Sequence, residues 1–393
     1  MRRFLFAASV AGLTAWSTAP VLAAEDVASE TPKSEWEVKP RWRLQYDWGK
    51  VSGPAGLAGT GPSEELRRAQ LGVDIRMPGG FSARIEGQFA GDPVELVDAY
   101  VAWDGGDFSV RAGQHKFFSP LEDMTSDLDT SFTERAALVD AFGFSRRTGL
   151  SAGYATGDFQ VNAGVGTDQL IELNDVADNS ISAHVRALWM PQAGKTKFHL
   201  GGAFHTKERR DSAAVGVRYR ALPLVHSATT RYVATPELFA DRERTWGVEA
   251  AAVNGPFHIA GEAYWHHVSR PDASDPTFFG AYAEAGLFLT PGDSRPLKGG
   301  AFGAVKPKRP LGEKGGIGAV QINARYDYLD LDDADVRGGQ QRGYMASLIW
   351  TPTNWMRLMA EYARLNYRGA AVTVAGSRDY GVDVVGARVQ FTY

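Results

Sequence analysis

The sequence lacks cysteine altogether, and it lacks any long apolar run beyond its N-terminus. A chain without thiols forms no disulfide and avoids mispairing in an oxidising compartment. The absence of a run of about 18 apolar residues excludes transmembrane helices, and the mean hydropathy is negative. A surplus of positive charge is also absent, because 42 basic residues stand against 46 acidic ones. That balance argues against nucleic acid as a partner.

The N-terminus has the pattern of a secretory signal peptide. Two arginines precede an apolar run over 4–16, and small residues surround Ala23. This order of charge, apolar core and cleavage site is typical of a signal peptide, and the run is too short to be an anchor. We expect residues 1–23 to be the signal peptide and residues 24–393 to form one domain.

The C-terminal stretch shows the pattern that organises the rest of the chain. Alternate residues of 381–393 are apolar, and those between them are polar or small. A period of two predicts a β-strand. A soluble strand seldom ends the chain on an aromatic residue such as Tyr393, whereas a strand of a transmembrane barrel places its aromatic at the membrane interface.

The same alternation recurs in fifteen further runs of roughly ten residues, separated by turn signals. These runs are 41–48, 64–77, 81–89, 94–103, 108–116, 146–156, 159–166, 181–190, 196–206, 245–253, 257–267, 278–289, 318–328, 342–350 and 355–365. Tryptophans near the run ends are typical of an interfacial girdle, namely Trp42, Trp48, Trp103, Trp189, Trp265, Trp350 and Trp355. The fold predicted is all-β, a 16-stranded antiparallel transmembrane β-barrel with inward-folded loops.

One further run, 213–221, also alternates. Counting it as a barrel strand would give an odd number, whereas bacterial single-chain barrels use even numbers. We therefore place it in a long loop over 207–243, with a seventeenth strand as the alternative.

Three connections are too long to be simple turns, namely 117–145, 207–243 and 291–317. Long segments of this kind are usually functional, and in a water-filled barrel they can fold inward and narrow the channel. Strand parity places the third connection at the periplasmic end, where turns are normally short.

Several motifs carry a family resemblance. They are RLQYDWG at 43–49, RRAQLG at 67–72, VDAYVAW at 97–103, GQHKFFSPLEDMTS at 113–126, FTER at 132–135 and VKP at 305–307. On these stretches the chain resembles the phosphate-selective porin O and P family over essentially its whole mature length. The resemblance implies a trimeric outer-membrane channel of a Gram-negative bacterium, with sixteen strands, inward-folded loops and basic side chains that guide anions.

The resemblance also assigns roles to single residues. Arg43, Arg67 and Arg68 match the family's wall arginines, Arg218 and Arg220 match arginines of an inward loop, and Lys306 matches a lysine of the long periplasmic turn. Arg209, Arg210 and Arg231 complete a basic segment with a single acid over 209–231, and Lys308 lies in the basic turn. Guanidinium groups bind phosphate through two hydrogen bonds, and lysine acts as a point charge.

Arg67 and Arg68 are adjacent, and neighbouring side chains of a regular strand point to opposite faces. Both therefore cannot face the lumen of a regular strand. Arg68 is the better candidate, and Arg67 is expected above the lipid or at a bulge. The basic run 306–309 has a second interpretation, a solvated turn without a role in conduction.

The first long loop departs from the family pattern, because it carries many acids and the family's phosphate-selective members have lysine where Asp123 stands. Its constriction residues are predicted to be Glu122, Asp123, Asp127, Glu134 and Arg135, with Asp129 and Asp140 as further acids. A constriction lined by carboxylates favours cations. The alternative is that these acids tie the loop to wall arginines.

Catalytic and metal chemistry have weak support. His266 and His267 are adjacent, so in a strand they point to opposite faces and cannot share a metal. Ser119, Ser131 and His115 are single candidates for nucleophilic catalysis, but no local signature joins them. We expect neither enzyme activity nor a cofactor.

The sequence therefore predicts an outer-membrane porin for passive diffusion of small hydrophilic solutes, biased towards anions of the phosphate type. The expected partners are small anions, outer-membrane lipid and two further copies of the chain. The acidic loop keeps a general or cation-preferring porin as the alternative, and a barrel enzyme is a more distant one.

Overall fold

The computed structural model describes residues 35–91, 93–117, 120–144, 146–171, 180–209, 216–313 and 315–393. The predicted signal peptide, Ser119 and Arg210 lie outside these residues. No helix among them is long and apolar enough to span a membrane.

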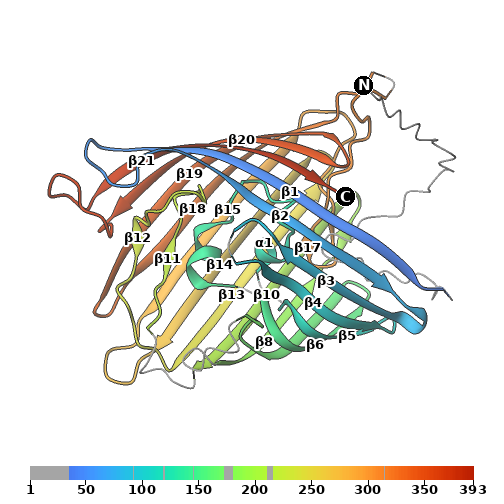
Figure 1. Cartoon of the computed structure of the whole chain (residues 1–393), viewed down its shortest axis with the longest axis horizontal. Coiled ribbons are helices and arrows are strands. Elements are labelled where there is room, and N and C mark those ends of the chain that lie inside the picture. Colours follow the sequence, from blue (N-terminus) through green and yellow to red (C-terminus); the bar gives the residue numbers. More distant parts are fainter. Residues whose placement is uncertain are drawn as a thin grey trace, which may run out of the picture.

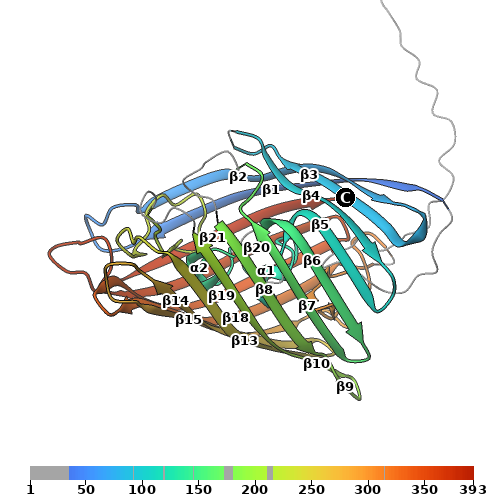
Figure 2. The ribbon, with the colours of Figure 1, turned by 90° about the horizontal axis from the view of Figure 1, so that it is seen from below.

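Sixteen long strands form one closed antiparallel barrel, in which each pairs with its neighbours along the chain and the last pairs with the first. They are β1 (Glu37–Ser52), β2 (Gly61–Arg76), β3 (Phe81–Gln88), β4 (Glu95–Asp104), β5 (Phe108–Lys116), β6 (Arg146–Thr156), β7 (Phe159–Thr167), β8 (Ser180–Trp189), β10 (Thr196–Arg209), β13 (Arg242–Asn254), β14 (Phe257–Ser269), β15 (Thr277–Phe288), β18 (Ala319–Asp333), β19 (Val336–Thr353), β20 (Met356–Arg368) and β21 (Tyr380–Thr392). They run obliquely along the barrel (Figures 1 and 2). All sixteen predicted strands are confirmed.

Shorter elements belong to the connections. The first long loop contains α1 (Leu121–Met124) and α2 (Ala137–Phe142). The second contains β11 (Arg220–Ala221) and β12 (Val233–Ala234), which pair only with each other, and the long turn contains the pair β16 (Leu297–Lys298) and β17 (Ala301–Phe302). The remaining elements are β9 (Gln192–Ala193), which extends the sheet beside β10, and the 3-10 turn η1 (Pro78–Gly80).

The second long loop contributes no barrel strand in its described part. Residues 216–221 contain only β11 and a single bridge from Val217 to Leu238. The placement of this segment in a loop is confirmed for those residues, because an even barrel already closes without it.

Alternation along the strands separates an apolar outer face from a polar inner face. In β1, Trp42, Leu44, Tyr46 and Trp48 are exposed, whereas Arg43, Gln45 and Asp47 are buried. The exposed side chains face hydrocarbon, as the period of two requires of a membrane barrel. The tryptophans assigned to the interfacial girdle are all exposed.

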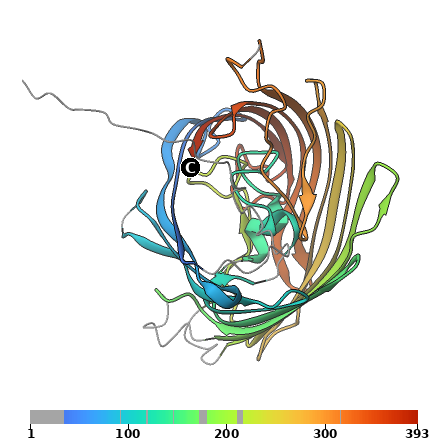
Figure 3. The same cartoon turned by 90° about the vertical axis from the view of Figure 1, so that its right-hand side faces the viewer.

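The two long loops and the long turn fold into the barrel. The second loop also reaches across to β2, where Ser227 Oγ lies 2.8 Å from Ser63 Oγ and His226 Nδ1 lies 2.9 Å from Glu65 Oε1. Leu138 and Phe142 of α2 form an apolar core with Tyr219 and Tyr232 of the second loop and with wall residues such as Leu329. Figure 3 looks along the barrel and shows α1 and α2, in teal, inside the ring on the side of the orange and red strands. The opposite wall, which starts at β1 and β2, keeps a polar inner face that positions the site described next.

Candidate functional site

The first long loop starts where Phe117 packs against a patch of glycines on β6 and β7. The ring lies against Gly149, Gly164 and Gly166, and a Cβ on Gly164 would be 2.9 Å from Phe117 Cδ1. Such a close approach leaves no space for any side chain larger than hydrogen. The loop ends after α2 at Gly143, which has a left-handed backbone (φ 64°) suited to a helix C-terminus.

The packed side of the loop is held by carboxylates of the barrel wall. Backbone N–H groups of the loop donate to wall acids: Leu121 to Glu249 Oε2 (2.9 Å), Glu122 to Glu262 Oε1 (2.6 Å), Thr133 to Glu361 Oε2 (2.8 Å) and Ala137 to Asp327 Oδ2 (2.9 Å). Buried N–H groups need acceptors, and here inward-facing strand residues supply them. These wall acids therefore hold the loop in place by accepting hydrogen bonds from its backbone.

The long periplasmic turn supports the loop from the other end of the barrel. Arg295 donates from Nη1 to Ser131 Oγ and to Glu284 Oε1, both at 2.8 Å, and from Nη2 to the Asp129 carbonyl at 3.0 Å. The Phe302 backbone N–H donates to Thr125 Oγ1 at 3.3 Å. The prediction that this turn folds inward is thus confirmed.

The free edge of the loop faces β1, β2, β5 and β6 across a cavity of about 130 Å³. We call its lining the constriction ring: Arg43, Arg68, Gln70, Lys116, Asp123, Asp127, Arg135, Phe144 and Arg146. Five of these residues are basic, namely four arginines and Lys116, and two carry carboxylates, so the ring has a basic surplus. It unites wall residues that are far apart in sequence with the tip of the loop.

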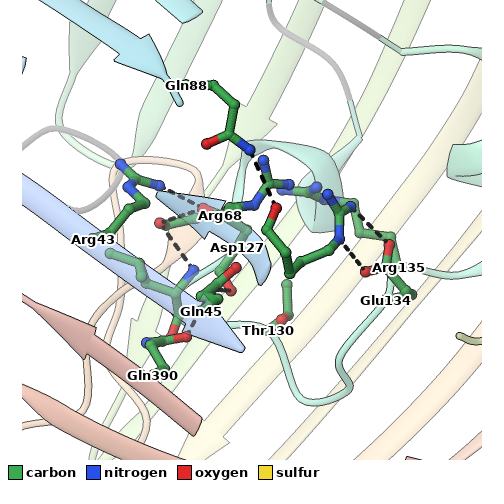
Figure 4. A network of polar contacts seen from close by, with 12 residues as sticks. Arg43, Gln45, Arg68, Gln88, Asp127, Thr130, Glu134, Arg135 and Gln390 are labelled. Carbon is green, nitrogen blue, oxygen red and sulfur yellow. Dashed lines mark hydrogen bonds and ion pairs between the residues drawn. The ribbon is translucent and has the colours of Figure 1, made fainter. Parts of the chain in front are cut away.

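Asp127 is the point where the loop meets the basic wall (Figure 4). Arg43 Nη1 donates to Asp127 Oδ1 at 2.6 Å, and Arg68 Nε forms an ion pair with Oδ2. Although burial favours the neutral acid, Arg68 and Arg43 hold the pKa of Asp127 well below its usual range. This carboxylate is therefore ionised throughout the physiological pH range.

The other basic residues of the ring contact two further acids: Lys116 and Arg135 share Asp123, and Arg146 pairs with Asp98. Lys116 contacts Asp123 through the ammonium group, 3.4 Å from Oδ1, and Arg135 donates to the carbonyl of Thr125 at 3.0 Å. Arg146 Nε donates to Asp98 Oδ1 of β4 at 2.7 Å. The three basic side chains are largely shielded by the protein, with 18 to 25% of each side chain exposed, so their charge interactions are stronger than in bulk water.

Arg67 and Arg68 both face the lumen, because β2 contains a bulge at this point. Gln45 of β1 pairs with Arg68 and Tyr46 with Leu66, so that Arg67 is the extra residue. Arg67 Nε donates to Glu134 Oε1 at 2.9 Å. A bulge is one of the two positions expected for Arg67, and it is confirmed. A regular strand would have placed Arg67 and Arg68 on opposite faces, but β2 is not regular at this point.

Glu134 sits between two guanidinium groups. Besides Arg67, Arg388 of β21 approaches its carboxylate, with 3.4 Å between Nη2 and Oε1. Burial opposes ionisation, yet Arg67 and Arg388 together lower the pKa of Glu134 to about 2.

The loop acids are thus engaged with the wall, with the loop itself or with the second long loop. Glu122 pairs with Arg325, and Asp140 accepts a hydrogen bond from the Leu222 backbone at 2.6 Å. Asp129 differs, because its burial outweighs Arg357 and Arg295 and raises its pKa to about 6. Asp127 and Glu134 anchor the loop to wall arginines. This is one of the two roles expected for the loop acids.

The other predicted basic residues lie outside the ring. Arg209 lies 3.5 Å from Glu243, Arg218 is exposed and 3.8 Å from Glu237, and Arg231 donates to the Ala228 carbonyl at 3.1 Å. Arg220 in the second loop and Lys306 and Lys308 in the long turn are exposed. They flank the constriction at its two ends without lining it.

Sequence reasoning missed Gln70, Lys116, Phe144 and Arg146 of the ring. Lys116 is the last residue of β5 and Arg146 the first of β6. Once the intervening loop is expected to fold inward, the residues that bracket it are candidates for the rim of the constriction.

The candidate residues for metal binding and catalysis do not assemble. His266 is buried beside Thr245 Oγ1 (2.7 Å), whereas His267, on the other face of β14, lies 2.9 Å from Thr277 Oγ1. Within the described ranges, no group of three or more His, Asp or Glu residues could hold a metal ion. Ser131 donates to Glu284, and His115 Nε2 lies 2.8 Å from Ser151 Oγ rather than beside Ser131.

A closed barrel with an apolar outer face, a polar lumen and an inward loop that narrows it defines an outer-membrane porin of a Gram-negative bacterium. The chain belongs to the phosphate-selective porin O and P family, whose model matches residues 38–393. An uncharacterized protein of Caulobacter vibrioides is 40% identical over 365 residues, which cover 90% of this chain and 74% of that protein.

Solved structures share the fold at low sequence identity. OmpT, an outer membrane protein of Vibrio cholerae, superposes with a TM-score of 0.60 at 12% identity, over 92% of this chain and 99% of that one. Its trimer form gives 0.58 at 13% identity, over 91% and 99%. An anion-selective porin from Comamonas acidovorans gives 0.54 at 14% identity, over 91% and 100%.

Proposed function

We propose that this porin conducts small hydrophilic solutes by passive diffusion with a bias towards anions, and that phosphate-type oxyanions are the favoured class. The observation that carries the proposal is the constriction ring, where four arginines, one lysine and two aspartates line a cavity of about 130 Å³. The family name and the anion selectivity of the Comamonas acidovorans porin agree with this bias.

The ring supplies the chemistry that oxyanion transfer needs. The guanidinium groups of Arg43 and Arg68 converge on the two oxygens of Asp127, Arg43 through a hydrogen bond and Arg68 through an ion pair. Two guanidinium groups at one point can bind an oxygen pair of phosphate. Lys116 and Arg146 extend the positive potential along the wall. Conduction also requires that no site hold the ion too tightly, and the nearby carboxylates of Asp98 and Asp123 limit the net charge.

The basic residues outside the ring have a supporting role in this proposal. Arg220 and Arg231 of the second loop lie on the extracellular side, and Lys306 and Lys308 lie on the periplasmic side. Positive potential at the two mouths raises the local concentration of anions and the rate at which they enter. This steering weakens as the ionic strength rises.

The test is the reversal potential of the reconstituted porin in a planar bilayer under a potassium chloride gradient. We expect the sign that corresponds to anion preference, and we expect phosphate added to both sides to reduce the chloride current. A reversal potential of the opposite sign would overturn the anion bias and leave the pore itself intact.

A general or cation-preferring porin is the second candidate. The observation in its favour is the set of loop carboxylates at Glu122, Asp123, Asp127 and Glu134. Their ion pairs with Arg325, Lys116, Arg43, Arg68 and Arg67 weigh against it, because a paired carboxylate attracts mobile cations weakly. The same reversal potential separates the two candidates.

We also propose that the barrel has no catalytic role. The separation of Ser131 from His115 supports this view, since a nucleophile needs a base within hydrogen-bond reach. Hydrolysis of ester and peptide substrates by the detergent-solubilised protein, lost when Ser131 is replaced by alanine, would contradict it.

We propose a homotrimer and a cleaved signal peptide over residues 1–23. The trimer form of the Vibrio cholerae OmpT structure supports the first point, and the charge and apolar pattern of the N-terminus supports the second. Native mass spectrometry of the protein extracted from membranes tests both at once. A mature N-terminus other than residue 24, or a mass other than three chains, would contradict the corresponding point.

A further inference from the structure

The carboxylate of Asp127 lies where a permeating oxyanion would bind. One of its oxygens is 2.6 Å from Arg43 Nη1, and the other forms an ion pair with Arg68 Nε. A phosphate group that bridged the same two guanidiniums would present a pair of oxygens in the same way. The oxyanion position in the ring is therefore already filled by the protein's own side chain.

The backbone around Asp127 is fixed by the wall, so the carboxylate stays near this position. Gln45 Nε2 donates to the Asp127 carbonyl at 3.3 Å. The next carbonyl, that of Leu128, accepts from Arg357 Nη1 at 2.5 Å and from Gln390 Nε2 at 3.1 Å. A displaced Asp127 side chain can rotate away and return while the backbone remains attached.

The other carboxylates near the ring do not occupy this position. Asp123 contacts Lys116 and Arg135. Glu86 contacts Arg43 at 3.1 Å, but it belongs to β3 and cannot move with the loop. Asp127 alone among the ring residues bridges Arg43 to Arg68.

We propose that Asp127 is a tethered competitor, an internal carboxylate that each permeating oxyanion must displace from Arg43 and Arg68. This inference rests on the proposed anion bias and adds a residue that determines specificity. Displacement shortens the residence of any bound oxyanion, which a channel needs for rapid exit. Competition with Asp127 also favours doubly charged oxyanions over halides. A halide carries charge but has no oxygen pair, whereas an oxyanion offers both the charge and the oxygen pair that Asp127 provides.

The first experiment compares the wild-type porin with Asp127→Asn in planar bilayers. The measured quantity is the phosphate concentration that halves the chloride current. We expect it to fall roughly tenfold or more in Asp127→Asn, because the competing charge is gone. The matched control is Asp140→Asn, which replaces an exposed carboxylate of the same loop outside the ring and should change the value little.

A second variant guards against a folding defect. Asp127→Ala opens the position entirely, and formate or acetate supplied in solution should then bind there and reduce the effect of phosphate, whereas neither should do so in the wild type. Heat-dependent migration on gels verifies that each variant forms the barrel. If formate and acetate leave Asp127→Ala unchanged, no carboxylate site exists there and the inference is wrong.

The outcomes for the two proposals can be told apart. A wild-type porin that prefers anions, with Asp127→Asn behaving like Asp140→Asn, overturns the tethered competitor and leaves the anion bias standing. Cation preference in the wild type together with absence of phosphate block in Asp127→Asn overturns both. An anion-selective wild type with tighter phosphate block in Asp127→Asn alone supports both.

Discussion

Arg388 on the last barrel strand donates two hydrogen bonds to Asp47 on the first, from Nε to Oδ1 at 2.7 Å and from Nη2 to Oδ2 at 2.6 Å. Both side chains are buried in the lumen. The pair closes the seam between β1 and β21, and the additional contact of Arg388 with Glu134 links that seam to the constriction loop. Barrel closure and loop position therefore share one guanidinium group.

Replacing Asp47 by asparagine should destabilise the barrel by about 3 to 5 kcal/mol, because it leaves a buried charge without its partner. The free energy of unfolding, measured by urea titration of tryptophan fluorescence in detergent, is the readout. The matched control is Asp383→Asn, which breaks the Arg364–Asp383 pair on β20 and β21, where both side chains are more than 40% exposed. An exposed pair contributes about 0 to 1 kcal/mol, so equal losses in the two variants would contradict the prediction.

Replacing Gly164 by alanine should displace Phe117 and with it the start of the constriction loop. The added Cβ would lie 2.9 Å from the ring, and overpacking of this kind costs about 1 to 3 kcal/mol. We expect a lower free energy of unfolding together with an altered single-channel conductance. Gly202→Ala on β10 is the control, because the nearest atom to its Cβ would be the Gly247 carbonyl oxygen at 3.4 Å. Unchanged conductance in Gly164→Ala would show that the glycine patch does not position the loop.

Replacing Arg68 by glutamine should lower the ratio of anion to cation permeability roughly twofold or more, because the ring loses one of its four arginines. The measurement is the reversal potential under a salt gradient. Arg218→Gln removes the same charge from an exposed position of the second loop and should have a smaller effect at high ionic strength, where distant charges are screened. Equal effects of the two substitutions at high salt would contradict a dominant role for the ring.

The stability of the barrel should depend on the ionisation of Asp129. Burial raises the pKa of this acid to about 6, above the value of about 3.9 in an unfolded chain. The folded protein therefore binds the proton more tightly, so this group adds stability below pH 6 and the contribution disappears as the pH rises through about 6. Asp129→Asn should remove this part of the pH dependence between pH 4 and 7, in unfolding titrations compared with the wild type.

Glu134→Gln is the control for this experiment. The pKa of Glu134 is lowered to about 2, so its contribution is present above the unfolded value near 4.3 and is lost only as the pH falls towards 2. Its substitution should leave the slope between pH 5 and 7 unchanged. A slope in Asp129→Asn identical to that of the wild type would show that Asp129 does not titrate in this range.

The strands of the barrel could be predicted because their signal is local. The alternation of Trp42, Leu44 and Tyr46 with Arg43 and Gln45 indicates which side chains face lipid, and strands such as β14 and β21 repeat it. Boundaries were less well predicted: the run 342–350 became β19 (Val336–Thr353), because a strand can continue beyond the membrane as long as its neighbours still pair with it.

The constriction could be predicted only in part. The loop and several of its arginines were identified, but Lys116 and Arg146 were missed, since their role depends on where the loop between them folds. Arg67 faces the lumen through a bulge whose position depends on the pairing of β1 with β2. No pattern within β2 alone reports that pairing.

By itself, the sequence determined the barrel, because lipid on one side and water on the other impose a period of two on each strand independently. The contacts that define the ring were decided by the tertiary structure. Arg43 and Asp127 are 84 residues apart, and whether a loop carboxylate repels ions or neutralises a wall cation depends on which side chain it meets after folding. The sequence determines which residues are charged. The distances between those charges are determined only when the barrel closes around the loop.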